Sequence, residues 1–75
     1  MPGSDPTFAT AEVALGLTRT ELAEALGVAY PTLGKWARGE RTPDAAAQTA
    51  LRMLFWLRDR GQLDAWLAVQ RRRAA

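Results

Sequence analysis

The stretch from Arg19 to Arg41 reads RTELAEALGVAYPTLGKWARGER. It begins as an amphipathic helix, stops at Gly27 and restarts within four residues. The restart contains Pro31 and Gly34, although glycine costs about 1 kcal/mol relative to alanine inside a helix and proline is tolerated only in the first turn. The second helix of this pair must therefore have a purpose other than stability.

Local signals predict the bounds of the first helix of the pair. Thr18 is followed three residues later by Glu21, the spacing of a capping box that satisfies the free amides at a helix start. Gly27 ends the helix, because glycine adopts the left-handed conformation at little cost. The residues that recur at helical spacing and should face inward are Leu22, Ala23 and Leu26.

The second helix of the pair is predicted from Tyr30 to Arg38. Pro31 places the start at residue 30 or 31, and Gly39 provides the end. An apolar anchor and a core-facing stripe are expected at Val28, Leu33 and Trp36. Gly34 should then lie on the outward side together with the polar residues of the helix.

Residues 1–5 are rich in proline, glycine and polar side chains, and we expect them to form a flexible arm. A helix is predicted from about Pro6 to Leu15, and Gly16 ends it. The apolar residues of this helix are Phe8, Val13 and Leu15.

The second half of the chain predicts two further helices. Thr42 and Pro43 are typical of an N-cap and a first-turn proline, so one helix should run from about Pro43 to Arg60. The other should run from about Gln62 to Arg72. The chain is therefore expected to be all-α: a five-helix domain over residues 6–70, with a basic flexible tail at residues 71–75.

Composition excludes several classes of function. The 75 residues include no cysteine and no histidine, so disulfides, conventional zinc sites, thiol nucleophiles and histidine acid–base chemistry are not available. We expect no enzyme activity, no metal, no cofactor and no small-molecule ligand. The start of the chain lacks the basic flank and apolar run of a signal peptide, and we expect a cytoplasmic protein with no membrane partner.

The net charge of +2 conceals an asymmetry along the chain. Residues 1–29 carry one arginine against four acids, a balance of −3, whereas residues 30–75 carry nine Lys and Arg against four acids, a balance of +5. A basic half of this kind suggests a polyanionic partner. Many solvated helices are equally basic, so the charge needs support from a motif.

The motif LTRTELAEALGVAYPTLGKWARGERTP resembles the helix-turn-helix of the Cro/lambda-repressor-like (XRE) group of phage and bacterial repressors. The resemblance covers about residues 15–57. The matching features lie at Leu22-Ala23, the Ala23–Gly27 spacing, Val28, Leu33, Trp36, Arg38-Gly39 and Thr42-Pro43. It implies a compact lambda-repressor-like domain that places the helix from Tyr30 in the major groove of double-stranded DNA.

The resemblance also implies site residues. Base contacts are expected at Tyr30, Pro31, Thr32 and Lys35, with Lys35 donating to guanine O6 or N7. Phosphate contacts are expected at Arg19, Arg38 and Arg41. Relatives often carry glutamate at the position of Ala37 and polar residues at those of Pro31 and Gly34, so the operator sequence cannot be transferred.

Each assignment has a plainer alternative. Lys35 would be unremarkable on a solvated helix face, and Tyr30 would serve equally as a boundary residue that covers the turn. Arg38 would be favoured by the dipole at a helix C-terminus. Trp36 shares a face with Leu33, which predicts a core residue and not a platform for stacking bases.

A homodimer is expected through the C-terminal half, because relatives usually bind two half-sites as dimers. The predicted interface consists of Met53, Trp56, Leu63, Trp66 and Leu67, which together exceed the apolar surface that a monomer of this size obviously hides. The alternative is that the fifth helix folds back and covers these residues within one subunit.

Two functions from different classes follow. The first is a sequence-specific transcriptional regulator: a homodimeric repressor that reads an inverted repeat, with its own promoter among the candidate targets. The second is a protein-interaction module of the same fold, similar to an antitoxin, that binds a partner protein through the Trp56/Trp66 surface.

Overall fold

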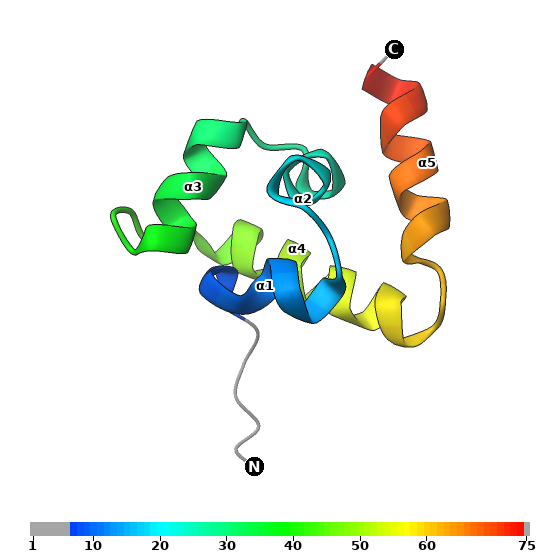
Figure 1. Ribbon diagram of the computed structural model, residues 1–75, viewed down its shortest axis with the longest axis horizontal. Helices are drawn as coiled ribbons and strands as arrows, with labels where there is room; N and C mark the ends of the chain where they lie inside the picture. The colour runs from blue at the N-terminus through cyan, green and yellow to red at the C-terminus, as the bar shows by residue number, and fades with distance from the viewer. Residues whose placement is uncertain (1–6, 75) are drawn as a thin grey trace.

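The part of the chain that the structure describes contains five helices, as predicted. The computed structural model describes residues 7–74, so the predicted arm at residues 1–5 lies outside the described residues. The helices are α1 (Phe8–Leu15), α2 (Arg19–Leu26), α3 (Tyr30–Arg38), α4 (Ala45–Asp59) and α5 (Leu63–Ala74), arranged as Figure 1 shows. The predicted all-α fold class is confirmed. Within the described residues, no helix combines the length and the apolar character needed to cross a membrane.

The capping box predicted for α2 is present. The Thr18 hydroxyl accepts from the Glu21 amide at 3.1 Å, and the Glu21 carboxylate accepts from the Thr18 amide at 2.9 Å. At the other end, Gly27 has φ 72° and its amide donates to the Ala23 carbonyl at 2.9 Å. Both ends of α2 are thus determined by neighbours in sequence, which is why they could be predicted.

The start of α4 differs from the prediction. The N-cap is Asp44 and not Thr42: the Asp44 carboxylate accepts from the Ala47 amide at 2.8 Å, and the helix begins at Ala45. Pro43 therefore precedes the helix and does not occupy its first turn. Aspartate and threonine are both good caps, and a carboxylate also interacts favourably with the helix dipole.

Helix α1 buries two of the three apolar residues predicted for it. Phe8 and Leu15 are buried together with Ala11, whereas Val13 is 89% exposed. Residues 8, 11 and 15 follow the helical repeat, and residue 13 lies on the opposite side. The helix begins at Phe8, and Pro6, its expected start, lies outside the described residues.

Helix α5 packs against α2 and extends further than predicted. It continues through Ala74, so residues 71–74 are helical where a flexible tail was expected. Leu63 and Leu67 are buried, and the Trp66 indole Nε1 donates to the Ala25 carbonyl at 2.8 Å. These contacts hold the helix along its length, which accounts for its persistence into the basic segment.

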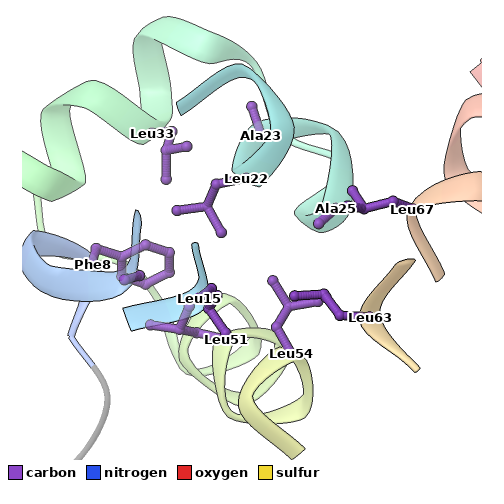
Figure 2. Close-up of a cluster of buried hydrophobic side chains, with 11 residues drawn as sticks. Phe8, Leu15, Leu22, Ala23, Ala25, Leu33, Leu51, Leu54, Leu63 and Leu67 are labelled. Carbon is purple, nitrogen blue, oxygen red and sulfur yellow. The ribbon is translucent and has the colours of Figure 1, made fainter. Parts of the chain in front are cut away.

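One hydrophobic core joins all five helices (Figure 2). Its centre consists of Leu22, Leu33 and Leu51, each almost completely buried and each from a different helix. The other buried apolar residues are Phe8, Ala11, Leu15, Ala23, Ala25, Leu54, Leu63 and Leu67. Because Leu33 belongs to this cluster, the core determines which face of α3 points outward.

We expect Leu22→Ala to lower the free energy of unfolding by about 2 to 5 kcal/mol, since it removes a fully buried side chain and leaves a cavity. The matched control is Val13→Ala, at a site that is 89% exposed, which should change stability by no more than about 0.5 kcal/mol. Urea denaturation followed by circular dichroism measures both variants. Equal losses would contradict the placement of these two side chains.

Candidate nucleic-acid interface

The connection between α2 and α3 brings the two helices close together. The Ala23 carbonyl accepts from the Gly27 amide at 2.9 Å and from the Val28 amide at 3.1 Å, which closes the end of α2. Ala23 is buried, and Val28 packs against the core. Pro31 lies in the first turn of α3, as expected, where its missing amide is not required. The small side chain of Ala23 permits the close crossing.

Helix α3 has one face in the core and one in solvent. Leu33 is 1% exposed. Trp36 is partly buried and packs against the core, with its ring centroid 5.0 Å from that of Phe8, so it faces the core as predicted. On the other side, Tyr30 is 53% exposed. Pro31 and Lys35 are also exposed, and Thr32 is half-buried, so the four predicted base-contact residues are accessible to different degrees.

Gly34 was expected on the outward face, but it is not accessible there, because arginine side chains cover it. It is buried. A Cβ atom at this position would lie 3.1 Å from Nη1 of Arg38 and 3.5 Å from Nη1 of Arg19. The absence of a side chain therefore gives room to the Arg38 guanidinium, whereas the Arg19 guanidinium would make only an ordinary contact with a Cβ atom. The close approach at Gly34 is made by arginines of the chain itself.

Both arginines beside Gly34 are paired with carboxylates. Arg19 Nε lies 2.7 Å from Glu12 Oε2 on α1, and both side chains are about 30% exposed, at 31% and 29%. Arg38 donates to Glu40, and this hydrogen bond lowers the pKa of the Glu40 carboxyl below its ordinary value. Sequence reasoning missed both carboxylates. The Arg38–Glu40 spacing was visible along the chain, whereas the contact with Glu12 depends on how α1 packs.

The other two cations of the predicted site are unpaired in the described part of the chain. Neither Lys35 nor Arg41 forms an ion pair with a carboxylate in residues 7–74, and both are exposed. Lys35 lies on α3 itself, and Arg41 lies three residues after the helix ends. The exposed surface of α3 thus presents one free ammonium group, with guanidinium groups at its margins.

The predicted dimer surface is corrected in part. Leu63 and Leu67 are buried in the core of the chain, and Trp66 is half-buried by its contact with α2. The alternative in which the fifth helix folds back holds for these three residues. Met53 and Trp56 on α4 are 59% and 54% exposed.

A small apolar hollow adjoins this exposed part of α4. Its volume is about 130 Å³, and it lies among α2, α4 and α5. The lining residues are Ala25, Leu26, Ala50, Met53, Leu54, Leu57 and Trp66. Beside it, the Arg60 guanidinium lies 4.1 Å from the centroid of the Trp56 ring, which partly covers the indole.

We expect Gly34→Ala to raise the free energy of unfolding by up to about 1 kcal/mol, the helix-propensity difference between the two residues. The φ of Gly34 is not positive, and the new methyl group would displace only the mobile end of Arg38, by a few tenths of an ångström. The contrasting variant is Gly27→Ala at φ 72°, which should lose about 1 kcal/mol or more because the left-handed conformation strains an alanine. Thermal denaturation compares the two; destabilisation by both would contradict this account.

Comparison with known proteins assigns the family of this segment. A family model described as helix-turn-helix matches residues 11–47, from within α1 to the first turn of α4. No curated protein and no solved structure gave a match. The family binds DNA and is not catalytic. Residues 11–47 therefore form a DNA-binding helix-turn-helix domain of the Cro/C1-type (XRE) family.

Proposed function

We propose that this protein is a sequence-specific transcriptional regulator that reads operator DNA with α3 in the major groove. The observation that supports it is the division of α3: Leu33 and Trp36 hold one face in the core, while Tyr30 and Lys35 project from the other. A helix presented in this way fits a groove about 12 Å wide.

Base recognition is assigned to four residues. Lys35 donates to guanine O6 or N7, and its ammonium group is not engaged by an acid of the described chain. Tyr30 and Thr32 bond base edges, and Pro31 packs against a thymine methyl group. With a single strong donor, α3 discriminates few base pairs in one half-site.

Phosphate contacts are assigned to Arg19, Arg38 and Arg41. Arg38 and Arg41 lie at the C-terminal end of α3, and the Arg19 guanidinium lies beside the middle of the helix at Gly34. Arg19 and Arg38 are oriented by Glu12 and Glu40. The exposed Arg38–Glu40 pair contributes no more than about 1 kcal/mol, so a DNA phosphate can displace its carboxylate. The Arg19–Glu12 pair is partly buried, and a phosphate can share its guanidinium. These contacts set affinity and register without reading sequence.

The small number of base contacts supports a homodimer on an inverted repeat, with half-sites about 34 Å apart. We assign the interface to the exposed face of α4, where Met53 and Trp56 project beside the apolar hollow. A dimer of this kind acts as a repressor by occupying a promoter, its own included.

Selection from random duplex DNA should recover an inverted repeat. Binding should weaken steeply with salt, with a log–log slope of about −0.9 for each phosphate contact. Lys35→Ala should relax the preference at one position of each half-site, because it removes a base contact. Arg19→Ala should weaken binding to all duplexes alike. Fluorescence anisotropy with matched and scrambled duplexes separates the two effects.

Absence of enrichment, together with unchanged binding in both variants, would overturn the regulator and favour the protein-interaction module. Recovery of a single, unrepeated site would retain DNA recognition and reject the dimer. Circular dichroism spectra of the two variants provide the control for folding.

Met53→Asp should shift the monomer–dimer equilibrium toward monomer by at least about tenfold, since a charge would be buried at the interface without a partner. Val13→Asp adds the same charge at an exposed apolar site on α1 and is the matched control. Sedimentation equilibrium measures both. Equal association constants for the two variants, or a monomeric wild-type protein at high concentration, would exclude this interface.

A further inference from the structure

The C-terminal end of α5 is fixed beside the helix-turn-helix. Trp66 Nε1 donates to the Ala25 carbonyl at 2.8 Å, and Gln70 Nε2 donates to the Glu24 carbonyl at 3.1 Å. Both carbonyls lie in the last turn of α2, where helical amides become scarce. The Glu24 carbonyl also accepts from the Gly27 amide at 3.2 Å, so the side chains of α5 complete the bonding of this turn. The last turns of α5 therefore take a defined position next to the turn that leads into α3.

This position brings Arg71 against the acids of α2. Its Nε lies 3.2 Å from Glu24 Oε1, and its Nη2 lies 3.6 Å from Glu21 Oε2. Without Arg71 these two carboxylates would present uncompensated negative charge next to the DNA-reading helix, where they would repel phosphates. The ion pairs are partly exposed, so their contribution to stability is small. The pairs act mainly by compensating the negative charge of Glu21 and Glu24 on this surface.

A groove of about 420 Å³ connects this end of α5 with the start of α3. Arg73 and Tyr30 both line it, and the floor comes from α2. The complete lining is Thr20, Ala23, Glu24, Gly27, Val28, Tyr30, Gln70, Arg71 and Arg73. In Figure 1, the start of α3 and the end of α5 lie toward the same side of the molecule, with α2 between them.

We propose that the end of α5 is a further DNA-backbone contact, in which Arg73 binds a phosphate of the strand that passes the start of α3. A duplex seated on Tyr30 must pass the groove, and Arg73 is the cation of that groove that pairs with no carboxylate of the described residues. Arg71 has a different role: its ion pairs compensate the charges of Glu21 and Glu24. The proposal rests on the proposed function and extends the DNA surface from two helices to three.

Arg73→Ala should reduce the magnitude of the log–log salt slope by about 0.9, the value for one lost phosphate contact. The base preference should stay unchanged, because phosphates carry no direct sequence information. Arg72→Ala is the matched control: it removes the same charge from an exposed site on α5 that does not line the groove. A third variant, Glu24→Gln, removes one acid beside the duplex and should tighten binding to all sequences. Anisotropy titrations at several salt concentrations on a long random duplex measure all three.

The outcomes separate this inference from the proposed function. If wild-type protein binds with a steep salt slope and Lys35→Ala alters base preference, but Arg73→Ala behaves like Arg72→Ala, the α5 contact is wrong and the regulator stands. If wild-type protein shows no salt-dependent duplex binding, both are overturned. A slope change confined to Arg73→Ala, with tighter binding by Glu24→Gln, supports the contact.

Discussion

The close crossing of α2 and α3 is the constraint on which the interface depends. It requires a small side chain at position 23, so that the helices can approach, and a left-handed backbone at position 27. The Ala23 carbonyl accepts a hydrogen bond from the Gly27 amide, which closes the end of α2. Once the crossing is made, Leu33 reaches the same cluster as Leu22. The orientation of α3 about its own axis is then determined, and so is the set of side chains that faces solvent. A larger side chain at residue 23 would separate the helices and change that set.

Charge on this surface is arranged by pairing. Three arginines at or near the reading helix contact acids of the same chain: Arg19 with Glu12, Arg38 with Glu40, and Arg71 with Glu24. Such pairs orient long side chains that would otherwise lose rotamer freedom on binding, a loss that costs up to about 2 kcal/mol for arginine. The same pairs compensate the negative charge of the acids, which would otherwise repel a polyanion. A modest net charge of +2 is therefore compatible with a DNA-binding surface.

The bounds of α2 and α3 were predictable from residues close in sequence. The start of α4 and the burial of Gly34 were not. The Thr18–Glu21 capping box and Gly27 act within a few residues, so they could be recognised without a structure. Asp44 and Thr42 compete as caps two residues apart, and sequence alone does not select between them. Gly34 follows Leu33 and lies at the border of the apolar stripe, so its burial depends on where the guanidinium groups of other positions reach.

Helix α5 is the clearest case in which sequence left two answers open, because an apolar stripe suits an internal core and a partner surface equally well. The docking of Leu63 and Leu67 against α2 and α4 uses most of that stripe.

What remains exposed on α4 is a patch around Met53 and Trp56. Specific protein interfaces bury about 1,200 Å² or more in total. Under the proposed function, association through so limited a patch is weak in free solution. Two subunits on adjacent half-sites would experience a high effective concentration, so DNA and the α4 surface would stabilise the dimer together. The same docking places the basic end of α5 beside the turn, where a helix that was expected to join two subunits can instead contact the duplex.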